Sequence, residues 1–136
     1  MKVIIDTNIW VSFLIGHQSQ LLRRILTDLR FDVYVCERLV EEILDVASRD
    51  KIRKHVSKSD VGDLMDIIHA FCQSVPVETS ASPSSIRDPK DLYLLSFAET
   101  IGADYIVSGD ADLTDLGQHK QTKIIKLSDF KAMMLY

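Results

Sequence analysis

The sequence predicts an α/β fold, with a central, mostly parallel sheet of about four to five strands between two layers of helices. Two observations lead to this prediction. Short apolar runs typical of buried strands alternate along the chain with longer segments whose apolar residues recur at helical spacing. The chain has 136 residues, the size of one domain, so we expect a single domain over residues 1–136.

Four runs have the composition of strands: residues 2–6, 31–35, 103–108 and 123–127. The first run is apolar throughout, as in a central parallel strand whose two faces are both covered. It stops at Asp6, which should therefore lie at the carboxyl edge of the sheet, where open α/β folds place their sites.

Helical spacing of apolar residues predicts helices in the intervening segments: residues 8–15, 21–29, 39–47, 61–72, 92–98 and 128–136. Residues 57–60 resemble a capping box that opens one of them. Residues 80–89 form a polar loop rich in serine and proline. The pair Asp88–Pro89 at its end is suited to the start of a helix, because proline is tolerated in a first turn.

Composition limits the partners and the setting of the protein. The net charge of −4 argues against a general basic coat for nucleic acid, although residues 49–58 hold five basic side chains against one acid. That stretch is either a solvated helix end or a contact for backbone phosphates. We expect a soluble, cytoplasmic protein, since no apolar run approaches a membrane span of ~20 residues and no secretory signal is visible. We expect Cys36 and Cys72 to be reduced packing residues.

Five acidic residues are expected to meet at one edge of the sheet. Asp6 and Asp110 follow strands, Asp88 and Asp91 open a helix, and Glu42 lies on another helix. Carboxylates gathered in one cleft repel one another, and hard cations such as Mg²⁺ or Mn²⁺ prefer oxygen ligands. The histidines show no metal-ligand spacing that would indicate zinc. The pattern therefore predicts a Mg²⁺ or Mn²⁺ site of the kind that hydrolyses phosphodiesters.

Four segments in a characteristic order carry a family resemblance: residues 5–8 with the apolar helix after them, residues 39–44, residues 87–91 leading to Ala98, and residues 102–113. In these segments the chain resembles PIN-domain proteins, and in particular the toxin components of toxin–antitoxin systems. The resemblance spans nearly the whole chain. It implies a PIN-like fold and a metal-dependent ribonuclease that cleaves single-stranded RNA. It also implies two further partners, an antitoxin protein and a second copy of the chain in a homodimer.

The resemblance implies an acidic quartet that binds the metal and serves catalysis: Asp6, Glu42, Asp91 and Asp110. Within it, Asp6 would be the central metal-bridging carboxylate. Asp112 matches a position that joins the environment of the second metal in some relatives. On the third helix, Glu42 fits the family pattern better than Glu41, which points about 100° away from it.

Short polar side chains beside the quartet are expected to support it. Thr7, Asn8 and Ser108 can orient a carboxylate or hold a metal-bound water. Asp88 either supports the site or only caps its helix. Trp10, one turn after Asp6, is expected to belong to the core and not to a base-stacking platform.

Two alternatives remain from the sequence. A haloacid-dehalogenase-like phosphatase also has an aspartate after its first strand, and residues 109–115 resemble its later acidic segment. Its chemistry needs a second aspartate two residues after the nucleophile, where this chain has Asn8. The other alternative is a catalytically silent PIN fold that only binds a partner, and the intact acidic quartet counts against it.

Overall fold

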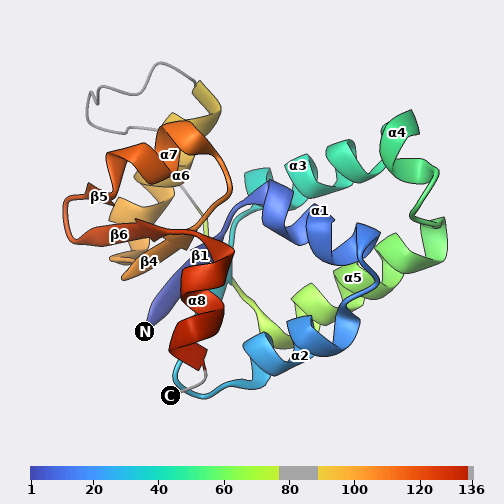
Figure 1. Ribbon diagram of the computed structural model, residues 1–136, viewed down its shortest axis with the longest axis horizontal. Coiled ribbons are helices and arrows are strands. Elements are labelled where there is room, and N and C mark those ends of the chain that lie inside the picture. The colour runs from blue at the N-terminus through green and yellow to red at the C-terminus, as the bar shows by residue number, and fades with distance from the viewer. Residues whose placement is uncertain (77–88, 135–136) are drawn as a thin grey trace.

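The computed structural model describes residues 1–76 and 89–134. Its strands form one sheet in the order β3-β2-β1-β4-β6-β5 (Figure 1). The strands are β1 (Lys2–Ile5), β2 (Asp32–Val35), β3 (Gln73–Ser74), β4 (Tyr105–Val107), β5 (Gln118–His119) and β6 (Thr122–Ile125). All neighbouring strands pair in parallel except β5 and β6, which pair antiparallel. The mostly parallel sheet confirms the predicted fold class.

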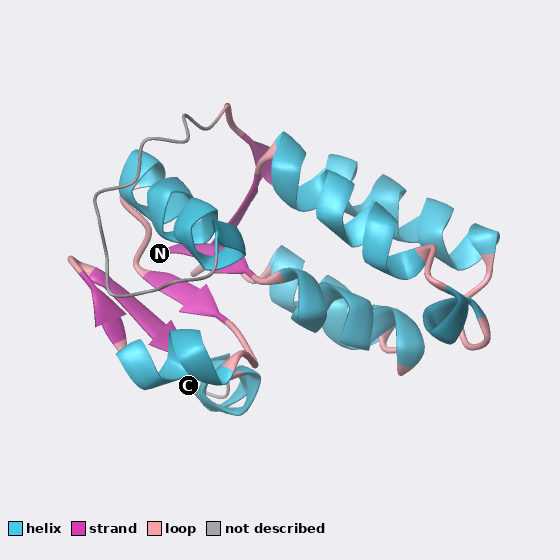
Figure 2. Cartoon of the chain, turned by 90° about the horizontal axis from the view of Figure 1, so that it is seen from above, coloured by secondary structure: helices cyan, strands magenta, loops and turns pink. Residues whose placement is uncertain are grey.

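Helices lie on both sides of this sheet, which gives the three-layer arrangement (Figure 2). They are α1 (Thr7–Ile15), α2 (Ser19–Thr27), α3 (Glu37–Ala47), α4 (Asp50–Arg53), α5 (Lys58–Phe71), α6 (Pro89–Ile101), α7 (Ala111–Leu116) and α8 (Leu127–Met134). Helices α1, α2, α3 and α5 pack on one another and extend beyond the sheet, with α4 at the far end (Figure 1). The predicted loop over residues 80–89 lies outside the described residues except for Pro89, which begins α6.

The structure differs from the sequence prediction mainly at short elements. The sheet has six strands in the described residues, against the predicted four to five, because β3 and β5 are edge strands of two residues each. A strand of two residues is too short to show an alternating apolar pattern, so the sequence did not predict β3 or β5. The second predicted helix is also too long, since α2 ends at Thr27 and the side chain of Leu29 is 99% exposed. There Asp28 accepts hydrogen bonds from the backbone and guanidinium of Arg30, which turn the chain toward β2.

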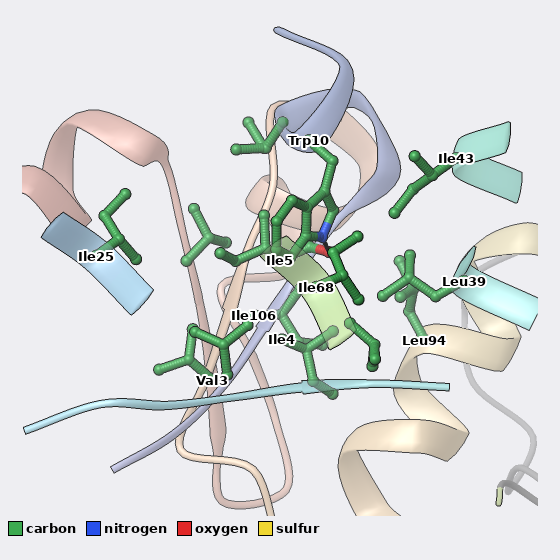
Figure 3. Close-up of a cluster of buried hydrophobic side chains, with 14 of the residues drawn as sticks. Val3, Ile4, Ile5, Trp10, Ile25, Leu39, Ile43, Ile68, Leu94 and Ile106 are labelled. Carbon is green, nitrogen blue, oxygen red and sulfur yellow. Dashed lines mark hydrogen bonds between the residues drawn. The ribbon is translucent and has the colours of Figure 1, made fainter. Parts of the chain in front are cut away.

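The core is built around β1, the central strand. Val3, Ile4 and Ile5 are almost completely buried, as predicted from their apolar run. Trp10 on α1 packs against this strand, and its indole Nε1–H donates a hydrogen bond of 2.9 Å to the carbonyl of Ile5 (Figure 3). The predicted core position of Trp10 is confirmed.

Local signals explain where several helices begin. The predicted capping box is present: the Ser57 hydroxyl accepts from the Asp60 N–H at 3.1 Å, and the Asp60 carboxylate accepts from the Ser57 N–H at 3.0 Å. The α1 helix begins directly after Asp6, which caps it. These caps supply partners for N–H groups that have none within the helix.

Strand register sets the position of the functional residues. In the β1–β4 pair, Ile5 lies opposite Val107, and the N–H of Asp6 donates to the carbonyl of Val107 at 2.9 Å. Asp6 and Ser108 therefore emerge side by side at the carboxyl edge of the sheet. Helices α1, α3 and α7 begin at this edge, because each follows a parallel strand.

Both cysteines are free thiols, as predicted, with Cys36 buried and Cys72 half-buried. Burial raises the pKa of both thiols, that of Cys72 to about 12, so they remain neutral packing groups. In the described ranges, no helix has the length and apolar character that crossing a membrane requires.

Replacing Trp10 by phenylalanine should lower the free energy of unfolding by about 1–3 kcal/mol, because the smaller ring leaves a cavity and the bond to the Ile5 carbonyl is lost. Urea unfolding followed by circular dichroism measures this change, since Trp10 is the only tryptophan available for fluorescence. Leu29→Ala, at an exposed apolar position, is the control and should change the free energy by less than about 0.5 kcal/mol. Equal midpoints for Trp10→Phe and the wild type would contradict the central role of this side chain.

Candidate functional site

The carboxylate of Asp6 lies at the end of β1 and is held from two sides. One oxygen, Oδ1, accepts the N–H of Thr7 at 2.7 Å, and the other, Oδ2, accepts the hydroxyl of Ser108 at 2.8 Å. Asp6 is only 8% exposed, and Ser108 is completely buried. The two hydrogen bonds fix the orientation of a carboxylate that has almost no contact with solvent.

A chain of hydrogen bonds connects Asp6 to Asp110. The Ser108 hydroxyl that donates to Asp6 also accepts the N–H of Asp110 at 3.0 Å. Asp110 in turn caps α7, and its Oδ1 accepts the N–H of Asp112 at 2.9 Å. Ser108 thus lies between the two acidic residues that follow β1 and β4. Its hydroxyl orients the side chain of Asp6 and holds the backbone of Asp110.

Glu42 approaches the same edge from α3. It is half-buried, whereas Glu41 is exposed, so Glu42 is the inward-facing member of the pair. Its Oε2 accepts a hydrogen bond of 2.8 Å from the hydroxyl of Tyr93 on α6. The position of Glu42 is therefore set by a contact between two helices that are far apart in the sequence.

The sequence prediction missed Tyr93, which is 4% exposed. Burial raises the pKa of this phenol well above its usual value, and its hydrogen bond to Glu42 and the charges of Glu42 and Asp6 raise it further. Tyr93 therefore stays protonated and acts as a donor. A hydroxyl within the otherwise apolar run of residues 92–95 was a weak signal for this role, because a tyrosine in a helix more often belongs to the core.

Arg38 is a second residue that the prediction missed. It lies one turn before Glu42 on α3, and its guanidinium carbon is 4.3 Å from the centre of the Tyr93 ring. Positions four apart share one face of a helix, which is the signal that could have associated Arg38 with Glu42.

The acidic groups influence one another electrostatically. The pKa of Asp6 is raised above its ordinary value chiefly by burial, and the negative charges of Glu42 and Asp110 raise it further. Hydrogen bonds from Ser108 and Thr7 oppose this shift by stabilising the carboxylate. Ionised Asp6 therefore costs folding free energy, chiefly because it is buried and further because of the charges of Glu42 and Asp110.

The remaining predicted site residues are either exposed to solvent or outside the described part of the structure. Asn8 is exposed next to Asp6, and Asp112 is exposed in the first turn of α7. Asp91 lies in the first turn of α6, but its side chain is outside the described part of the structure, as is the whole of Asp88. Among the side chains that are described, no three acidic, histidine or cysteine groups stand close enough together to hold an ion.

The described groups at this edge have the donor chemistry that a hard cation prefers. Thr7 is 2% exposed, and its Oγ1 lies near the Tyr93 hydroxyl but outside hydrogen-bonding geometry. Within the described residues this Oγ1 has no hydrogen-bond partner. A buried hydroxyl beside carboxylates can hold a water of a hydrated cation. The carboxylates of Asp6, Glu42 and Asp110 add oxygen donors, the ligand type that hard cations prefer. These three carboxylates do not by themselves stand close enough together to hold an ion.

A family model for the PIN domain matches residues 2–112. The chain belongs to the PIN-domain family. The match extends from β1 into α7 and includes every position of the predicted acidic quartet. PIN domains are generally nucleases and typically depend on divalent metals, so the fold is of the nuclease type and nucleic acid is the expected class of partner. The membership decides against the haloacid-dehalogenase alternative. No curated protein matches the sequence.

The raised pKa of Asp6 predicts how Asp6→Asn changes stability with pH in metal-free protein. The folded state disfavours ionised Asp6, so the wild type loses stability as pH rises from 3.8, the ordinary value, through the raised pKa. Asparagine does not ionise. The free energy of unfolding of Asp6→Asn, minus that of the wild type, should therefore increase over this window and then level off.

Urea unfolding with excess chelator between about pH 4 and pH 8 tests this expectation. Asp115→Asn, at an exposed position on α7, is the matched control for loss of a carboxylate. A difference for Asp6→Asn that stays constant or falls with pH would contradict the electrostatic cost assigned to Asp6.

Proposed function

We propose that this protein is a divalent-metal-dependent endoribonuclease that hydrolyses phosphodiester bonds in single-stranded RNA at the carboxyl edge of its sheet. The observation that carries the proposal is the buried Asp6 carboxylate, oriented by Thr7 and Ser108 and close enough to Glu42 and Asp110 for their charges to raise its pKa. In a PIN domain, this arrangement supports a site for a hard cation.

In this proposal the metal ligands and catalytic residues are the acidic quartet: Asp6, Glu42, Asp91 and Asp110. Asp6 would be the central ligand, and Asp112 would join the environment of a second ion. Thr7, Asn8, Asp88 and Ser108 have supporting roles. The acidic quartet would hold Mg²⁺ or Mn²⁺, which would supply activation of a water molecule and neutralisation of the charge that develops on the phosphate.

Neighbouring residues contribute by fixing the orientation of the carboxylates before the substrate binds. The Thr7 N–H and the Ser108 hydroxyl keep Asp6 in one orientation, so its carboxylate does not reorganise during the reaction. The Tyr93 hydroxyl does the same for Glu42. The Thr7 hydroxyl, which has no hydrogen-bond partner among the described residues, offers a hydrogen-bonding position for a water molecule beside Asp6.

We further propose that the enzyme is the toxin of a toxin–antitoxin pair and works as a homodimer. The support is the resemblance of residues 5–8, 39–44, 87–91 and 102–113 to such toxins. A ribonuclease without narrow substrate requirements harms its own cell, so a paired inhibitor is a consistent partner. A small reading frame directly upstream that encodes a DNA-binding motif would support this role.

The first prediction from the proposal is that cleavage of single-stranded RNA requires Mg²⁺ or Mn²⁺. The purified protein is incubated with mixed RNAs in each metal and in excess chelator, because the carboxylates need a cation to approach a phosphate. Asp6→Asn, purified in parallel, controls for contaminating ribonucleases and should be inactive. Equal cleavage in chelator would exclude the metal mechanism. No cleavage in either metal would instead favour a partner-binding module.

The second prediction compares two adjacent glutamates on α3. Glu42→Gln should lower the rate of RNA cleavage at least about tenfold, because it removes the charge of a metal ligand. Glu41→Gln, at the exposed neighbour, removes the same charge and should change the rate less than about twofold. Titrating Mn²⁺ should show a higher metal requirement for Glu42→Gln alone. If Glu41→Gln proves the more damaging change, the assignment of Glu42 to the site is wrong.

A further inference from the structure

The exposed side chain of Arg38 takes part in the contact between α3 and α6, next to the acidic site. Its guanidinium lies over the Tyr93 ring with 4.3 Å between the guanidinium carbon and the ring centre. The hydroxyl of the same ring donates to Glu42 at 2.8 Å. Tyr93 therefore connects a solvent-facing guanidinium with a carboxylate of the proposed metal site.

This arrangement differs from the other cation–ring contacts in the described residues. Lys2 lies 5.9 Å from the ring of Tyr34, and Arg30 lies 5.4 Å from that of Phe31. Arg30 is also bound by the carboxylate of Asp28 and by two carbonyls near the end of α8. Within the described part of the chain, Arg38 has no carboxylate at ion-pair distance.

A guanidinium that lies over a ring is well suited to bind phosphate. A contact with a ring does not use up hydrogen-bond donors, and Arg38 has no carboxylate partner among the described residues, so its N–H groups can make two parallel hydrogen bonds to one phosphate. The ring contact also restricts the side chain in advance, which lowers the entropy lost on binding. A polyanion that approaches Asp6, Glu42 and Asp110 is repelled by their charges, and a cation at the rim offsets that repulsion.

We propose that Arg38 binds a backbone phosphate of the RNA next to the acidic site, and that Tyr93 is the positioning residue that holds Arg38 and Glu42 in register. The inference rests on the proposed nuclease function and adds a substrate-binding residue to it. The ring of Tyr93 positions Arg38, whereas its hydroxyl positions Glu42. The two roles of Tyr93 are therefore separable by substitution.

The test for Arg38 measures RNA binding and cleavage separately. The Kd of a short fluorescent single-stranded RNA is measured by anisotropy in Ca²⁺, and KM and kcat are measured in Mn²⁺. Arg38→Gln should raise Kd and KM roughly tenfold, the size expected for a charge-assisted phosphate contact. The kcat and the Mn²⁺ concentration for half-maximal rate should stay within about twofold of the wild type.

Two further variants control for charge and chemistry. Arg24→Gln removes the same charge from an exposed position on α2 and should change Kd less than about twofold. Arg38→Lys keeps the charge but loses the planar fork, so its Kd should fall between the wild type and Arg38→Gln. Because Arg38 is exposed, the melting temperatures of these variants should match that of the wild type.

Tyr93→Phe separates the two roles of the tyrosine. The ring remains, so RNA Kd should stay near the wild-type value, but Glu42 loses its donor, so kcat should fall and the Mn²⁺ requirement should rise. Tyr93→Leu, without ring or hydroxyl, should show both defects. If Tyr93→Phe weakens RNA binding and leaves the Mn²⁺ requirement unchanged, the positioning role assigned to Tyr93 is overturned.

These measurements distinguish failure of this inference from failure of the proposed function. If the wild type cleaves RNA and Arg38→Gln binds it no more weakly than Arg24→Gln does, the role of Arg38 is overturned and the nuclease proposal stands. If the wild type binds RNA without cleaving it and Arg38→Gln weakens binding, the role of Arg38 stands and the nuclease proposal fails. A wild type that binds no RNA overturns both.

Discussion

The buried carboxylate of Asp6 is the constraint on which the rest of this structure depends. It lies where the central strand β1 ends, and its two hydrogen-bond donors come from the first residue of α1 and from the end of β4. Burial disfavours its charge, and the charges of Glu42 and Asp110 add to that cost. The surrounding fold must therefore hold an unfavourable charge in one orientation, which requires a rigid junction between the two strands.

The apolar core supplies that rigidity. Val3, Ile4 and Ile5 are covered on both faces of the sheet, and Trp10 packs against them while binding the Ile5 carbonyl. Burial of such side chains contributes roughly 1.5–3 kcal/mol each relative to leaving them exposed. A strand that is packed this tightly can end at a residue whose charge is unfavourable without unfolding locally. Stability in the core thus offsets the cost of burying the Asp6 carboxylate.

The contact between α3 and α6 addresses a second electrostatic difficulty. In the function that we propose, a protein with net charge −4 and an acidic site has to attract an RNA chain that is itself negative. Tyr93 brings a guanidinium and a carboxylate together around one ring. In our proposals the guanidinium binds the substrate and the carboxylate binds the cation. Such an arrangement places positive charge locally, at the rim of the site, and does not require a basic surface over the whole molecule.

The sequence by itself determined the fold class, the PIN-domain membership and the position of Asp6, because an apolar run that stops at a carboxylate has a direct physical meaning. It also indicated Glu42 over Glu41 and placed Trp10 in the core. The sequence did not predict the exact helix ends or the two-residue strands, as Leu29 and β3 show. So few residues are too short a segment to show a pattern of apolar positions.

The sequence suggested Thr7 and Ser108 as supporting groups, but only the tertiary structure decided which carboxylate each group contacts, and it alone showed Tyr93. Ser108 reaches Asp6 across 102 positions, and Tyr93 reaches Glu42 across 51. Such pairs depend on strand register and on the packing angle between helices. Local residue patterns do not encode either quantity, so the partners of a functional side chain become known only when the chain is folded.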